Sequence, residues 1–67
     1  MTYFCVDKDG TERCSNECPI RGSFRWESWT DMYGTTCHII RLPEGSIERL
    51  TGHKITWENE PLKVNKL

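Results

Sequence analysis

The sequence lacks a long hydrophobic run, and it lacks an excess of charge of either sign. Its longest apolar stretches are a few residues, as at positions 37–40 if His38 is counted. Because a transmembrane helix needs about 20 apolar residues, we expect no membrane span. Nine Lys and Arg against ten Asp and Glu give a net charge of −1, with the two signs interspersed. Nucleic-acid binders normally carry a clear cationic excess, so we expect no polynucleotide partner.

The first seven residues lack the charged region and the long apolar stretch of a signal peptide. We therefore expect a cytosolic, reducing compartment. In that setting the four cysteines favour free thiols or a metal over disulfides.

The sequence also lacks an arrangement of residues that would support catalysis. Cys37 and His38 are neighbours, and adjacent side chains of a strand point to opposite faces, so they would not form a dyad. No pair of Asp or Glu residues has a spacing that brings a general acid and a general base together. Gly45-Ser46 is without the glycines and lysine of a phosphate-binding loop. We therefore expect a binding protein and not an enzyme.

What the chain does have is aromatic residues and cysteines in a small body. Sixty-seven residues can bury one core, so residues 1–67 are predicted to form a single small β domain. A core of this size barely offsets the entropy of ordering the chain, and such domains recruit a metal, disulfides, oligomerisation or heavy aromatic packing. Four Cys, three Trp, two Tyr and two Phe make several of these solutions available.

Alternation of apolar and polar residues between turn signals predicts a mainly β fold. The predicted strands cover residues 2–7, 11–16, 23–30, 35–42 and 54–58. Leu62 and Val64 are expected to add an edge pairing, while Ser46 as N-cap and Gly52 as a left-handed stop predict one helical turn. The expected architecture is a small, twisted antiparallel sheet of four or five strands, with that helical turn before the last strand. Since edge strands invite pairing, a homodimer is also predicted.

Side-chain parity within the predicted strands divides the aromatic residues. In residues 23–30, Phe24 and Trp26 share one face and are expected in the core, with Trp29 on the opposite, solvent side. Residues 35–42 are partly apolar on both faces, which indicates a central strand. Trp57 is expected to point inward from the last predicted strand.

The cysteines allow three interpretations. The turn signal at positions 9–10 predicts a tight hairpin, in which a loop of two or four residues sets Cys5 opposite Cys14, whereas a loop of three does not. A structural zinc site would use all four cysteines, with His53 as a substitute ligand: Cys5, Cys14, Cys18 and Cys37. The interpretation we favour makes Cys5 and Cys37 small core side chains and gives the other two no role. A disulfide between Cys5 and Cys14 is the third interpretation.

Aromatic and cationic residues form two sets that suit different ligands. A solvent-facing tryptophan flanked by arginines is typical of a protein-interface anchor, which predicts a partner-binding set: Arg21, Arg25, Trp29 and Tyr33. Stacking aromatics beside cations also suit a nucleotide base and its phosphate. The nucleotide-binding alternative uses three later cations: Arg41, His53 and Lys54.

Three segments of the sequence form a pattern: YFCVDKDGTE at residues 3–12, LPEGSIERLTG at 42–52 and ITWENEP at 55–61. The combination resembles short uncharacterised proteins of phages and prophages of Bacteroides-type bacteria. These proteins have no established activity, and the resemblance covers under half of the chain, so it carries no functional residues across.

The resemblance implies a phage origin and a place in the host bacterial cytoplasm. It also supports the leading hypothesis, in which a small binding protein inhibits a bacterial host protein, such as a defence component, by direct contact. The alternatives are a sponge that sequesters a small nucleotide and a zinc-stabilised structural module.

Overall fold

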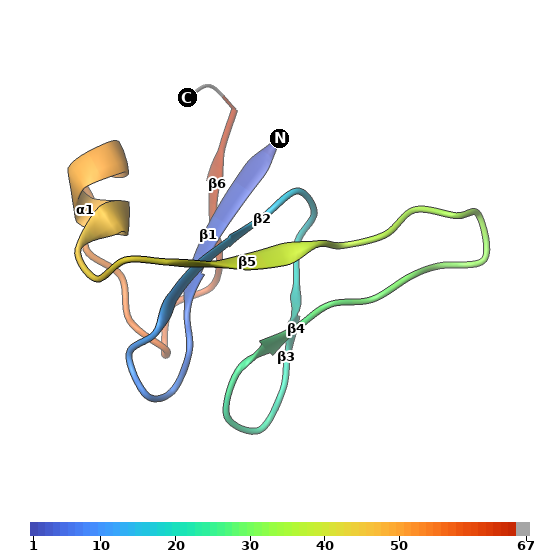
Figure 1. Cartoon of the computed structure of the whole chain (residues 1–67), viewed down its shortest axis with the longest axis horizontal. Coiled ribbons are helices and arrows are strands. Elements are labelled where there is room, and N and C mark those ends of the chain that lie inside the picture. Colours follow the sequence, from blue (N-terminus) through green and yellow to red (C-terminus); the bar gives the residue numbers. More distant parts are fainter. Residues whose placement is uncertain (66–67) are drawn as a thin grey trace.

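The structure is a computed structural model that describes residues 1–65, in which six strands and one short helix are present (Figure 1). In chain order the elements are β1 (Thr2–Val6), β2 (Glu12–Ser15), β3 (Ile20–Arg21), β4 (Trp26–Glu27), β5 (Ile39–Leu42), α1 (Ser46–Thr51) and β6 (Leu62–Val64). Four strands form an antiparallel sheet in the order β5-β2-β1-β6, and β3 pairs with β4 in a separate hairpin. The predicted mainly β architecture, with a short helix before the last strand, is confirmed. The last two residues of the predicted domain lie outside the described range.

A tight hairpin joins β1 to β2. The carbonyl of Asp7 accepts the amide of Gly10 at 2.9 Å, and the amide of Asp7 donates to the carbonyl of Thr11 at 2.9 Å. The loop between the last paired residues is therefore three residues long, 8–10. Gly10 ends it with φ of 91°, a left-handed conformation that glycine adopts without a steric penalty.

The three-residue loop sets the register of β1 against β2 and thereby places the cysteines. Phe4 lies opposite Cys14, and Cys5 lies opposite Arg13. Because directly opposed residues share a face of the sheet, Cys5 and Cys14 point to opposite faces. Of the loop lengths considered, the structure has the one that does not set Cys5 opposite Cys14. The interpretation with a disulfide between them is wrong, since both thiols are free.

The hydrophobic core lies on the face of the sheet that carries Phe4 and Val6. Ile47 of α1 packs against these two side chains, and all three are buried. A set of partly buried side chains completes the core: Cys14, Leu42, Ile55, Leu62 and Val64. The core therefore joins the four-stranded sheet to α1 and to the chain that follows it.

The long connection between β2 and β5, which includes β3 and β4, covers the opposite face of the sheet. Cys5 points to this face and is buried. Trp26 of β4 is also buried, and its indole Nε1 donates to the carbonyl of Val6 at 3.0 Å. The backbone amide of Trp26 donates to Asp7 Oδ1 at 2.9 Å, and Arg13 Nε donates to Asp7 Oδ2. The predicted burial of Trp26 is confirmed.

α1 is a six-residue helix whose N-terminus is held by a side chain from the sheet. The carboxylate of Glu12, in β2, accepts the backbone amides of Gly45 and Ile47, the latter at 2.8 Å. Gly45 precedes the helix with φ of 86°, and Ser46 Oγ donates to a preceding carbonyl and caps no amide. The predicted N-cap at Ser46 is therefore wrong, whereas the left-handed stop at Gly52 is confirmed.

Three predicted strands differ from the structure because side-chain alternation does not identify a pairing partner. In residues 23–30 only β4 belongs to a strand, and Phe24 is 72% exposed in the β3–β4 loop and not in the core. Residues 54–58 form no strand, although Ile55 reaches the core and Trp57 is half-buried. β5 covers only the second half of residues 35–42, and it lies at the edge of the sheet and not at its centre.

The two edge strands of the four-stranded sheet, β5 and β6, each pair with a single neighbour among residues 1–65. A second copy of the chain would extend the sheet by pairing with either edge. The homodimer stays a prediction.

Replacing Asp7 with Ala is expected to lower the free energy of unfolding by about 3–5 kcal/mol, because it leaves the buried Trp26 amide and the partly buried Arg13 guanidinium without their acceptor. Asp7→Asn retains an oxygen for the Trp26 amide, so it is expected to lower the free energy of unfolding by less than Asp7→Ala does. Urea denaturation followed by tryptophan fluorescence measures both variants. Equal stability of Asp7→Ala and the unmodified chain would contradict this role.

Candidate functional site

The connection between β4 and β5 projects from the body of the molecule as a narrow hairpin, residues 29–37, which we call the finger (Figure 1). Thr30 pairs with Thr36, and the turn beyond them is organised by Asp31. Asp31 Oδ1 accepts the amide of Tyr33 and a second amide of the turn, each at 2.9 Å. The turn therefore satisfies its own backbone donors, which gives the finger a defined shape.

Two large side chains stand at the tip of the finger. Met32 is 88% exposed and Tyr33 is 86% exposed. Asp31 is the one charged residue in the finger, and its carboxylate is engaged within the turn. The tip is therefore a largely apolar surface of the kind that protein interfaces bury. Sequence reasoning selected Tyr33 and missed Met32, although the Asp-x-x-Gly turn signal places both residues at the turn.

Trp29 lies at the base of the finger and not at its tip. Its indole Nε1 donates to the carbonyl of Cys18 at 2.7 Å, and its own carbonyl accepts the amide of Cys37 at 2.8 Å. Its side chain is half-buried and not fully on the solvent side. These contacts orient the finger on the chain that precedes β3. The role of Trp29 as a partner anchor stays a prediction.

Arg21 of the predicted partner-binding set makes its contacts within the molecule. Its guanidinium lies 4.4 Å from the ring centroid of Trp26 and 4.6 Å from that of Trp57. It also donates to the carbonyls of Trp57, at 2.6 Å, and Asn59, at 3.2 Å. Arg21 therefore ties the β3–β4 hairpin to the chain that follows α1. Arg25, in the loop of the same hairpin, is exposed.

Arg21→Ala is expected to lower the free energy of unfolding by about 1–2 kcal/mol, because it removes a cation–aromatic stack and two hydrogen bonds. Arg25→Ala, in the same hairpin, is the matched control and is expected to change that free energy by less than about 0.5 kcal/mol. Thermal and urea unfolding measure both variants. Equal destabilisation by the two substitutions would rule out the structural role of Arg21.

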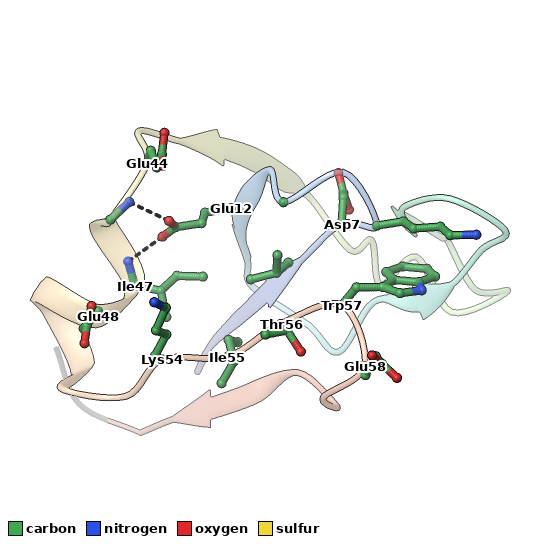
Figure 2. A pocket seen from close by; sticks show the side chains of 14 residues that line it. Asp7, Glu12, Glu44, Ile47, Glu48, Lys54, Ile55, Thr56, Trp57 and Glu58 are labelled. Atoms are coloured by element: carbon green, nitrogen blue, oxygen red, sulfur yellow. Dashed lines mark hydrogen bonds between the residues drawn. The ribbon is translucent and has the colours of Figure 1, made fainter.

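A groove of about 690 Å³ runs between the β1–β2 turn, α1 and the chain that follows α1 (Figure 2). Its apolar lining comes from four residues: Val6, Ile47, Ile55 and Trp57. Five carboxylate residues and two lysines also line it: Asp7, Glu12, Glu44, Glu48, Glu58, Lys8 and Lys54. The groove is therefore apolar and acidic, a combination that sequence reasoning did not find because its residues come from separate segments.

The three cations of the predicted nucleotide-binding set do not converge. Lys54 lines the acidic groove, whereas Arg41 lines a separate hollow of about 270 Å³ together with three carboxylate residues. His53 is exposed and lines neither of them. A phosphate would meet more carboxylates than cations at either place, so the electrostatics do not favour the nucleotide alternative.

All four cysteines are free. Cys5 and Cys37 are each 1% exposed, which confirms the prediction that they are small buried side chains. Cys14 packs against the core on the other face of the sheet, and Cys18 is exposed. Within residues 1–65 no group of three or more His, Cys, Asp or Glu side chains is placed to hold a metal ion. The structure therefore does not bring the predicted zinc ligands together.

Burial raises the pKa of the Cys5 thiol from 9.0 to about 12, and the nearby negative charge of Asp7 adds to the rise. Burial also raises the pKa of the Cys14 and Cys37 thiols. These three thiols are therefore protonated at neutral pH, which makes them poor nucleophiles.

The free energy of unfolding is expected to fall as the pH rises through 9.0 towards about 12, because the Cys5 thiol ionises near 9.0 in the unfolded chain but stays protonated in the folded chain until about 12. Below pH 9.0 the Cys5 thiol is protonated in both the folded and the unfolded chain, so the stability that is lost at higher pH is fully present there. Cys5→Ala is expected to flatten the fall. The difference between the two melting-temperature profiles separates Cys5 from other groups that titrate in this range, and parallel profiles would contradict the raised pKa.

No helix in the part of the chain that the structure describes is long and apolar enough to cross a membrane. Comparisons with protein-family models, curated proteins and solved structures found no match for this chain.

Proposed function

We propose that this chain is a small phage-encoded binding protein that inhibits a bacterial host protein, such as a defence component, by direct contact in the host cytoplasm. The finger makes that contact. The observation that supports the proposal is the exposure of Met32 and Tyr33 at the tip of a hairpin with a defined turn. The phage origin and the bacterial partner rest on the sequence resemblance.

A preformed finger favours binding for two physical reasons. Burial of a side chain such as Met32 removes apolar surface from water and stabilises the complex by about 1.5–3 kcal/mol. A turn that is already ordered loses little conformational entropy on binding, so less of this gain is offset. Aromatic residues and Met are also enriched in protein interfaces. The partner site that fits the tip is an apolar pocket.

The other predicted anchors lie away from the tip, and they would widen the contact with a partner that also reaches the base of the finger and the β3–β4 hairpin. Trp29 is half-buried at the base of the finger, and Arg25 is exposed in the preceding hairpin. Inhibition follows if the pocket that receives the tip is one that the host protein needs for its own activity.

The double variant Met32→Ser, Tyr33→Ser is expected to weaken partner binding by about tenfold or more, since both residues act as anchors. Leu50→Ser is the matched control, because Leu50 is an exposed apolar residue on α1, at the other end of the molecule from the finger (Figure 1). Host lysate is passed over the immobilised protein, the retained host protein is identified, and calorimetry measures its affinity for each variant.

Inhibition is tested by assaying the retained host protein with and without the unmodified chain and the double variant. Circular dichroism checks that each variant is folded. Unchanged affinity of the double variant would show that the finger is not the contact. Retention of no host protein would count against the proposal as a whole.

A further inference from the structure

The groove beside α1 is a second surface, distinct from the finger in place and in chemistry (Figures 1 and 2). Val6 and Ile47 are buried and form its apolar floor. Ile55 and Trp57, from the chain that follows α1, are partly buried and line one side. The floor and this side together form an apolar strip.

Three exposed carboxylates stand around this strip, and we call them the rim glutamates: Glu44, Glu48 and Glu58. Among residues 1–65 the single ion pair joins Asp7 to Arg13. Within that range the rim glutamates therefore have no cationic side chain in contact. Their charges remain available to a ligand.

The two lysines of the lining do not balance the carboxylates. Asp7 is paired with Arg13, and the other four carboxylate residues against two lysines leave an excess of two negative charges in the lining. The ammonium group of Lys8 lies 5.7 Å from the ring centroid of Phe24, a residue outside the groove. The negative potentials of carboxylates around a concave apolar surface add, so the groove attracts cations and repels anions.

The amides at the start of α1 do not offset this charge. Glu12 already accepts the amides of Gly45 and Ile47, as the dashed lines in Figure 2 show. An anionic ligand would find those donors occupied by a carboxylate and would be repelled by it. The chemistry of the groove therefore selects a ligand that is both cationic and apolar.

We propose that the groove binds an extended segment of a partner protein in which lysines or arginines alternate with aliphatic residues. Successive side chains of an extended peptide point to opposite sides. Aliphatic side chains can then cover Val6 and Ile47, while the long, flexible side chains of the cations between them bend back to the rim glutamates. The volume of about 690 Å³ lies in the range of ligand-binding sites. This surface goes beyond the finger contact and does not depend on it.

The probe is the acetylated and amidated peptide Lys-Val-Lys-Val-Lys, titrated at low salt into nitrogen-15-labelled protein. Saturable shifts are expected for the backbone amides of residues 44–48 and 54–58. The affinity is expected to fall as sodium chloride is raised, because salt screens exposed charges. The acidic analogue Glu-Val-Glu-Val-Glu is expected to give no saturable shifts. Shifts spread over the whole surface, or equal binding of the two peptides, would overturn the proposal.

Removing carboxylates and removing lysines from the groove are expected to change the affinity for the basic peptide in opposite directions. Replacing all three rim glutamates with Gln is expected to weaken binding of the basic peptide by about tenfold. Lys8→Gln combined with Lys54→Gln is expected to tighten it by about threefold. Glu27→Gln removes an exposed carboxylate outside the groove and is expected to leave the affinity within about twofold.

The side chains changed in these variants are exposed, so folding is expected to be retained, and the dispersion of the amide spectrum checks it. The double variant Met32→Ser, Tyr33→Ser is expected to bind the basic peptide like the unmodified chain, which separates failure of the groove from failure of the finger. Unchanged affinity of the rim-glutamate variant, or weaker binding by the lysine variant, would show that charge complementarity does not govern the groove.

Discussion

The buried carboxylate of Asp7 is the contact on which the arrangement of this protein depends. The backbone of Asp7 closes the β1–β2 hairpin, and the side chain of Asp7 accepts hydrogen bonds from Arg13 and from the amide of Trp26. One residue thus joins two strands of the sheet to the long connection that carries β3, β4 and the finger. A chain of 67 residues has little apolar surface to bury, so a satisfied polar contact of this kind has a large share in determining how the connection lies on the sheet.

Two further side chains hold other parts of the chain against the sheet and the β3–β4 hairpin by polar contacts of the same kind. Arg21 stacks on Trp26 and Trp57 and holds the chain after α1 against the β3–β4 hairpin. Glu12 holds the start of α1 against β2. These ties leave two surfaces with different chemistry: a largely apolar finger tip on one side, and an acidic groove with an apolar floor between α1 and the β1–β2 turn. A small protein with two such surfaces can recognise two features of one partner, which raises specificity more than either surface alone.

Local sequence signals predicted where turns and elements occur better than they predicted which elements lie next to each other in space. The turn that ends at Gly10 and the stop at Gly52 follow from residues close together in the sequence, and the structure contains both. The length of the first loop was open, and a change of one residue there turns every β2 side chain to the other face. The loop has three residues and not two or four, so Cys5 and Cys14 point to opposite faces of the sheet. Phe24 fits the alternation of a strand but lies in an exposed loop, because alternation describes a pattern and not a partner strand.

The sequence by itself determined the mainly β class, the short helix before the last strand and the presence of a turn at the finger tip, because side-chain periodicity and turn chemistry act over a few residues. It also determined that no part of the chain carries a large cationic excess. Only the tertiary structure decided that Arg21 lies over the rings of Trp26 and Trp57 while Met32 is exposed, and that carboxylates from separate segments surround one groove. Exposure and charge at a surface depend on contacts between residues that are distant in the chain, and these contacts exist only after the chain has folded.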